Sequence, residues 1–82
     1  MKIKYFAWIK DITNKNHEKI SDSKITDIKS LKKYLSIKYP KLKKHLSNKE
    51  MIQIAINSEY IRKNQLIKND DVIAIFPPVS GG

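Results

Sequence analysis

The last residues of the sequence, Val79-Ser80-Gly81-Gly82, form the segment best suited to carry chemistry. They follow Pro77-Pro78, a pair that cannot continue a β-ladder and favours an extended path, so we expect the chain to leave the folded body there. Residues 78–82 in extended form would reach about 17 Å, far enough to enter a narrow channel in another protein. Because the two glycines have no Cβ, only backbone atoms would have to pass close to a catalytic surface.

The backbone carboxylate of Gly82 is the group that we expect to react. A carboxylate is a poor electrophile, whereas its acyl-adenylate reacts readily, and a sulfur nucleophile would convert that adenylate into a thiocarboxylate. The sequence has no cysteine, so a side-chain thiol could not carry sulfur as a persulfide. Glycine-rich ends are also common in termini that are merely frayed. The stiff Pro77-Pro78 exit directly before this terminal segment favours a functional tail.

The other reactive side chains predict no site. His17 and His45 show neither metal-ligand spacing nor a nucleophile partner, and without cysteine a thiolate metal cluster is not possible. We therefore expect no bound metal, no bound cofactor and no active site on this chain alone. The 82 residues suffice for one compact domain, which is too small for a deep cofactor cavity.

Basic residues outnumber acidic ones, by 17 to 8, and the formal charge is +9. Clustered lysines would indicate a nucleic-acid partner, because they release counterions from a phosphate backbone. Here they are scattered from Lys2 to Lys68, with Arg62 the one arginine, which is typical of solvated faces and argues against nucleic acid. The densest cluster could still steer an acidic partner or an anionic ligand; it comprises Lys41, Lys43, Lys44 and Lys49.

The elements that must position the tail begin with a predicted hairpin. Residues 2–9 alternate apolar and polar side chains at first and are rich in β-branched and aromatic types, as in a half-buried strand. Residues 13–16 are polar and turn-like, and residues 17–21 are predicted to return as the second strand.

A helix is predicted from Thr26 to about Tyr39. Thr26 can cap it, Asp27 lies in its first turn, where exposed amides favour a negative charge, and Pro40 ends it. Its apolar residues recur at three- and four-residue spacing opposite lysines, so they are expected to face the core. These residues are Ile28, Leu31 and Leu35, with Tyr34 or Ile37 beside them.

The C-terminal half predicts a second hairpin and a last strand. Residues 41–50 form a polar connector with a short helical turn around Leu42 and Leu46, and residues 51–57 are a strand by branching and length. A turn at residues 57–59 leads into a short extended Tyr60-Ile61. Residues 72–76 follow another turn and are continuously apolar, which predicts a central strand buried on both faces.

This order of elements predicts an α+β fold, in which one main helix packs on one face of a mixed sheet, the ubiquitin-like β-grasp. We expect residues 1–77 to form the β-grasp domain and residues 78–82 a flexible carrier tail. Met1-Lys2-Ile3-Lys4 is no apolar leader, and the sequence has no run of about 18 apolar residues, so we expect no membrane association and a cytoplasmic location.

Several segments resemble the small subunit of molybdopterin synthase, a member of the MoaD/ThiS family of ubiquitin-like sulfur carriers. Ile75-Phe76-Pro77-Pro78-Val79-Ser80-Gly81-Gly82 is similar to the family's terminal signature, which is far more specific than a lone Gly-Gly. Three further segments match the family's first strand and the region before that signature: Lys4-Tyr5-Phe6-Ala7, Ala55-Ile56-Asn57-Ser58-Glu59-Tyr60-Ile61 and Asn69-Asp70-Asp71-Val72. Trp8 and the basic charge depart from the family's usual pattern.

The resemblance implies a carrier cycle. An activating enzyme that uses ATP would adenylate Gly82, a sulfur donor would supply the thiocarboxylate, and the large synthase subunit would receive the inserted tail, residues Pro78, Val79, Ser80, Gly81 and Gly82, within a heterotetramer. Sulfur would then pass to cyclic pyranopterin monophosphate and build the molybdopterin dithiolene. The resemblance also assigns Phe6, Tyr60 and Phe76 to an apolar face that contacts the partner; the alternative is that they pack within the sheet.

Three other functions remain compatible with the residues. A sulfur carrier for thiamin thiazole or cysteine synthesis would share the fold and the tail. A ubiquitin-like modifier would transfer the activated Gly82 to a lysine of a target protein. A nucleic-acid-binding module would use the lysines.

Overall fold

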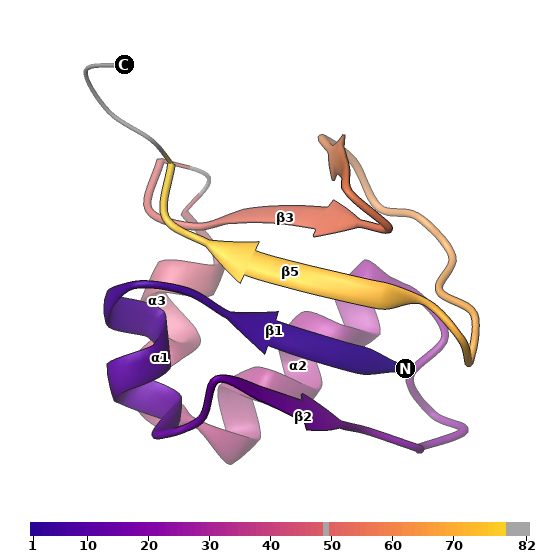
Figure 1. Ribbon diagram of the computed structural model, residues 1–82, viewed down its shortest axis with the longest axis horizontal. Helices are drawn as coiled ribbons and strands as arrows, with labels where there is room; N and C mark the ends of the chain where they lie inside the picture. Colours follow the sequence, from indigo (N-terminus) through magenta and orange to yellow (C-terminus); the bar gives the residue numbers. More distant parts are fainter. Residues whose placement is uncertain (49, 79–82) are drawn as a thin grey trace.

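The computed structural model describes residues 1–48 and 50–78, and over these residues the chain forms a mixed sheet covered on one face by helices (Figure 1). The strand order is β2-β1-β5-β3-β4, with β1 and β5 parallel and the other neighbours antiparallel. The strands are β1 Lys2–Tyr5, β2 His17–Lys19, β3 Gln53–Ile56, β4 Glu59–Ile61 and β5 Val72–Phe76. This is the predicted α+β, β-grasp architecture, with the last strand in the middle of the sheet.

The main helix, α2, spans Ile28–Lys38 and begins with a reciprocal cap. Asp27 Oδ1 accepts a hydrogen bond from the Ser30 amide at 2.8 Å, and Ser30 Oγ accepts one from the Asp27 amide at 3.0 Å. The prediction that Thr26 caps the helix is therefore wrong by one residue, because only Asp27 has Ser30 at the third helical position. Of the two alternatives for the core-facing stripe, Tyr34 packs against the core and Ile37 is exposed.

The predicted strand at residues 2–9 is wrong beyond Tyr5. Ala7 adopts a positive φ of 54°, which breaks the extended path, and helix α1 then runs over Trp8–Thr13. Ile9 and Thr13 are buried at helical spacing, one turn apart, and Asn14 ends the helix in the left-handed region. The connection between β1 and β2 is therefore a helix. The ring of Trp8 lies edge-on to that of His45, which follows α2 in the chain, with 5.0 Å between the ring centroids.

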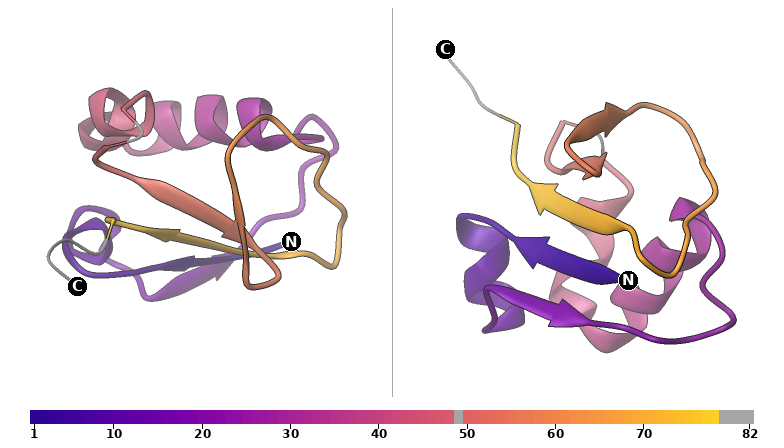
Figure 2. Two further views of the ribbon diagram at one scale, coloured as in Figure 1. Left: turned by 90° about the horizontal axis from the view of Figure 1, so that it is seen from above. Right: turned by 45° about the vertical axis from the view of Figure 1, so that its right-hand side comes forward.

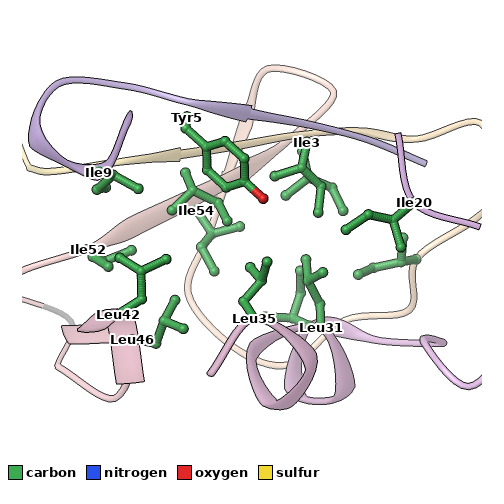
Figure 3. Packing of buried hydrophobic residues seen from close by; sticks show 14 of the residues in the cluster. Ile3, Tyr5, Ile9, Ile20, Leu31, Leu35, Leu42, Leu46, Ile52 and Ile54 are labelled. Atoms are coloured by element: carbon green, nitrogen blue, oxygen red, sulfur yellow. The ribbon is translucent and has the colours of Figure 1, made fainter. Parts of the chain in front are cut away.

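The connector after α2 is helical, as predicted around its two leucines. A 3-10 turn, η1, spans Pro40–Leu42 and helix α3 spans Lys43–Leu46, with Leu42 and Leu46 buried. The core lies between these helices and the inner face of the sheet, where Ile3, Tyr5 and Ile54 oppose the stripe of α2 (Figure 3). In the described parts of the chain, no helix is long and apolar enough to cross a membrane.

The central strand β5 is buried on one face only, which corrects the expectation of burial on both. Ile73 and Ile75 point into the core and are inaccessible, whereas Val72, Ala74 and Phe76 are half-buried on the opposite side. Helices α2 and α3 lie over a single face of the sheet (Figure 2), so an apolar outer position here is not a core position. The apolar side chains on the outer face of β5 are therefore not covered by the helices.

The carboxylate of Glu18, on the core-facing side of the edge strand β2, links this strand to the helical layer by hydrogen bonds. Glu18 lies opposite Ile3 and its side chain is 8% exposed. Its oxygens accept hydrogen bonds from the hydroxyls of Tyr5 at 2.6 Å and Tyr39 at 2.5 Å and from Lys38 Nζ at 2.5 Å. Burial acts to raise the pKa of Glu18, but the hydrogen bonds from Lys38, Tyr39 and Tyr5 outweigh it and lower that pKa to about 2.

Glu18→Gln should lower the free energy of unfolding by about 2 kcal/mol near neutral pH, because it removes the charge that three donors share. The carboxylate stabilises the fold fully above its ordinary pKa of 4.5, and this contribution is lost as the pH falls to the folded value of about 2. Chemical denaturation at several pH values should therefore show the difference between wild type and variant shrinking over this range. The same change at the exposed Glu50 should stay within about 0.5 kcal/mol. A difference that does not vary with pH would contradict the assignment to charge.

Candidate functional site

The site is built around the end of β5, the strand that leads to the tail. β5 is held by β1 on one side and β3 on the other, and the Phe6 amide donates to the Ile75 carbonyl at 3.2 Å, one step beyond the named ladder. Pro77 has no amide hydrogen with which to continue this bonding, and Pro78 is already exposed. The described chain therefore leaves the sheet from its central strand, where the sequence predicts the exit.

The predicted tail itself lies mostly outside the described residues. This applies to Val79, Ser80, Gly81 and Gly82, and of the predicted tail the structure describes Pro78 alone. The division into a body of residues 1–77 and a tail of residues 78–82, and the role of Gly82, stay predictions.

Two of the three predicted interface aromatics meet on the outer face of the sheet. The rings of Tyr60 and Phe76 lie 5.4 Å apart between centroids at an angle of 39°. The strand register explains the contact, since Tyr60 pairs with Ala55 and Ala55 with Ala74, two residues before Phe76 on the same face. The two alanines leave room for the larger rings beside them. Tyr60 is 71% exposed, so packing within the sheet is not its role.

Phe6 is placed at the same end of the sheet by its backbone. It directly follows β1, its amide is bonded to Ile75, and its side chain is 46% exposed. The structure thus gathers Phe6 and the Tyr60–Phe76 pair at the end of the sheet from which the chain exits. Exposed apolar side chains that gather in one place, unlike single ones, are typical of a docking surface.

A polar network that the sequence analysis did not identify fixes the hairpin carrying Tyr60. Asn57 and Ser58 turn β3 into β4 with positive φ values of 51° and 72°. The Asn57 side chain donates to Asp71 Oδ1 and accepts from the Val72 amide, both at 2.9 Å, so the turn is fastened to the start of β5. Hydrogen bonds from the Lys68 amide and from Asn57 hold the pKa of Asp71 below its usual range. Asn57 and Asp71 both lie in segments that resemble the family, and that resemblance was the signal from which this network could have been predicted.

The predicted basic cluster lies elsewhere. Lys41, Lys43 and Lys44 are exposed on η1 and α3, in the helical layer on the opposite side of the sheet from the Tyr60–Phe76 pair, and Lys49 is outside the described residues. The structure therefore does not bring this cluster to the aromatic surface.

Neither a metal centre nor a catalytic cleft is evident in the described residues. No three histidine, cysteine or acidic side chains gather there in a way that could hold a metal ion. An open groove of about 640 Å³ lies between α2 and the β3–β4 hairpin, with apolar walls from Ile28, Ile54 and Ile61 and cations from Lys29 and Lys63. Its described lining contains no carboxylate or imidazole for acid–base chemistry.

Comparison with known proteins gives consistent matches over the whole chain. The model of the ThiS family matches residues 3–82. The molybdopterin synthase sulfur carrier subunit of Dictyostelium discoideum is 38% identical over 85 residues, which cover 99% of this chain and 94% of that protein.

Solved structures agree in fold. Small archaeal modifier protein 1 of Methanosarcina acetivorans is 30% identical with a TM-score of 0.79, and the match covers 99% of this chain and 94% of that one. In the complex of subunits 1 and 2 of the molybdopterin-converting factor from Helicobacter pylori, the matching chain is 30% identical with a TM-score of 0.69, over 99% and 96% of the two chains.

Proposed function

The chain belongs to the ThiS family, and from this premise we propose that it is the sulfur-carrier small subunit of molybdopterin synthase. The observation that carries the proposal is the full-length match, at 38% identity, to a sulfur carrier subunit of that enzyme. The Pro-Pro exit from the central strand and the exposed aromatics beside it support the proposal. In the proposed complex, the aromatics would dock on the partner and residues 78–82 would enter it.

The proposed chemistry takes place at the carboxylate of Gly82. One carboxylate oxygen attacks the α-phosphate of ATP within an activating enzyme, pyrophosphate leaves, and an acyl-adenylate forms. A sulfur nucleophile then attacks the acyl carbon, AMP leaves, and the end of the chain becomes a thiocarboxylate. Two transfers of sulfur to cyclic pyranopterin monophosphate build the dithiolene of molybdopterin, and after each transfer the end of the chain is again a carboxylate. In this scheme ATP and the sulfur donor belong to other proteins, and the chain holds no cofactor of its own.

The proposed partner is the large subunit of the synthase, in a heterotetramer. The structure of the Helicobacter pylori subunit 1 and subunit 2 complex supports this, because the matching chain there is assembled with a second subunit. We assign docking of the body to Phe6, Tyr60 and Phe76 and insertion to residues 78–82. Ordering a free tail costs about 1 to 2 kcal/mol per residue, and burial of the aromatics would offset that cost. We place the reaction in the cytoplasm, where ATP is available.

Intact mass spectrometry tests the loading step directly. After incubation with ATP, the activating enzyme and a sulfide source, we expect a gain equal to the mass difference between sulfur and oxygen, localised to the C-terminal peptide. Omitting ATP should abolish the gain, which controls for oxidation elsewhere in the chain. A chain that stays at its original mass with each activating enzyme of its own organism would contradict the proposal.

A second candidate is a ubiquitin-like modifier. It is favoured by the 30% identity to small archaeal modifier protein 1, which equals the identity to the subunit in the Helicobacter pylori complex. The same experiment in the presence of cell protein separates the two, since conjugation would give isopeptide-linked adducts on lysines. A carrier for thiazole or cysteine synthesis would be loaded in the same way, and it is distinguished by which acceptor enzyme takes the sulfur.

A further inference from the structure

The outer face of β1 and β2 carries a ladder of basic side chains. Ile3 and Tyr5 point into the core, so the alternation of the strand turns Lys2 and Lys4 outward. The antiparallel register places Lys19 opposite Lys2 and His17 opposite Lys4. We call these four residues, Lys2, Lys4, His17 and Lys19, the basic ladder.

The basic ladder is unfavourable for the isolated fold. Like charges directly opposite on neighbouring strands destabilise a sheet by a few tenths of a kcal/mol. Within the described chain, none of the three lysines makes an ion pair, and Glu18, the one acidic residue of β2, faces the core. Asp70 and Asp71 lie near Lys2 in the loop before β5, but the Asp71 carboxylate is already bonded to Asn57 and to the Lys68 amide. An anionic surface laid over the ladder would relieve this repulsion.

The ladder is continuous with the aromatic surface at the tail exit. β1 lies beside β5, with Lys4 paired to Ala74. With a strand spacing of about 4.8 Å and a rise of about 3.4 Å per residue, Lys4 is about 8 Å and His17 about 12 Å from Phe76 in the plane of the sheet. A standard interface covers about 800 Å² on each partner, a disc of about 16 Å radius. A protein centred on Phe76 would therefore cover Lys4 and His17 and reach Lys2 and Lys19 at its rim.

We propose that the basic ladder binds an acidic surface on the large-subunit partner, which covers the ladder and the Tyr60–Phe76 pair together. The inference rests on the proposed function for the identity of the partner. It adds that the partner presents carboxylates over β1 and β2 and an apolar surface over β4 and β5. We favour a protein over a single-stranded nucleic acid, because the matching chain in the Helicobacter pylori complex is assembled with a second protein subunit.

Charge reversal at Lys4 tests the proposal. Lys4→Glu should weaken binding to the large subunit from the same organism by about tenfold or more, mainly through slower association, and should reduce the salt dependence of the affinity. The matched control is Lys33→Glu, the same change at an exposed position of α2 in the helical layer. It alters the net charge equally, and its affinity should stay within about twofold of wild type. Because Lys4→Glu removes a positive charge from beside Lys2 and Lys19, the thermal midpoint should not fall, which separates the effect on binding from any effect on folding.

The outcomes distinguish this inference from the function on which it rests. Wild-type binding that Lys4→Glu leaves unchanged, or that Lys33→Glu weakens equally, would overturn the inference and leave the carrier function standing. Tighter binding of wild type to a short single-stranded RNA than to the large subunit, at physiological salt, would overturn the assignment to a protein. If wild type can be thiocarboxylated but does not bind the large subunit, the inference and this choice of partner both fail, while sulfur carriage remains. If it neither loads nor binds, the proposed function fails as well.

Discussion

Deletion of Gly82 should abolish sulfur loading while leaving the thermal midpoint unchanged. The deletion moves the reacting carboxylate back by about 3.4 Å, and a misplacement of only about 1 Å can already reduce a rate by about a hundredfold. The buried hydrophobic residues of the described chain all lie between Ile3 and Ile75, so the deletion removes none of the core. Loading is measured as thiocarboxylate formed per unit time by intact mass, and folding by thermal denaturation of the same preparation.

A chain extended by one glycine is the complementary variant, because it tests whether the position of the carboxylate or the loss of a residue causes the effect. It keeps the wild-type residues and displaces the carboxylate by the same step in the opposite direction, so it too should fail to load. Replacing Gly81 by valine keeps the length and adds a Cβ branch next to the reacting group, and we expect the same loss. Normal loading of the deletion variant would contradict the assignment to Gly82, and a large fall in its thermal midpoint would contradict the separation of tail from body.

The side-chain pattern predicted most of the sheet and the main helix, because each of those elements buries one regular face. The helix α2 repeats its apolar residues at helical spacing, and β3 and β5 are rich in isoleucine. Helix α1 escaped prediction because it has only six residues and its Trp8-Ile9 continues the apolar character of β1. The strand ends at the positive φ of Ala7, a conformation that the ordinary preferences of alanine do not predict.

The residues of the candidate site could be predicted in part, but the contacts between them depend on strand pairing and could not. Phe6, Tyr60 and Phe76 came from the family resemblance, and the structure shows the contact between the last two, which depends on the register of β3, β4 and β5. The basic ladder depends likewise on the pairing of β1 with β2, since residues 2 and 19 are far apart in sequence. A count of lysines along the chain describes scattered charges, whereas the sheet gathers four basic residues on one side.

The exposed aromatic pair on a rigid sheet also explains why a carrier needs a folded body. A bare peptide with the same ending would have to order its whole length on binding, at about 1 to 2 kcal/mol per residue. In this fold, β5 is already held between two strands as far as Phe76, so docking of the body requires no ordering of this segment. The preformed body therefore reduces the entropy lost on docking, and in the proposed complex it would fix the point from which the tail enters the partner.

Tyr60→Ala should weaken binding to the large subunit by about 2 kcal/mol, or about thirtyfold, and leave the free energy of unfolding within about 0.5 kcal/mol. The ring is 71% exposed in the free chain, so its removal opens no cavity, whereas in the complex it would leave a desolvated pocket unfilled. Calorimetric titration measures the affinity and denaturant unfolding the stability. Tyr60→Phe, which keeps the ring, should retain most of the affinity, and Ile37→Ala, an exposed apolar truncation on α2, should change neither quantity.

Phe76→Ala should differ in kind, because Phe76 is half-buried in the central strand and its truncation should lower both the affinity and the stability, the latter by about 2 kcal/mol. The rings of Tyr60 and Phe76 lie 5.4 Å apart, so the two truncations should not be additive. We expect a coupling free energy of about 1 kcal/mol in a double-mutant cycle on binding. Additive effects on the affinity would mean that the two rings do not act as one surface. Equal losses of affinity for Tyr60→Ala and Ile37→Ala would show that the outer face of the sheet is not the interface.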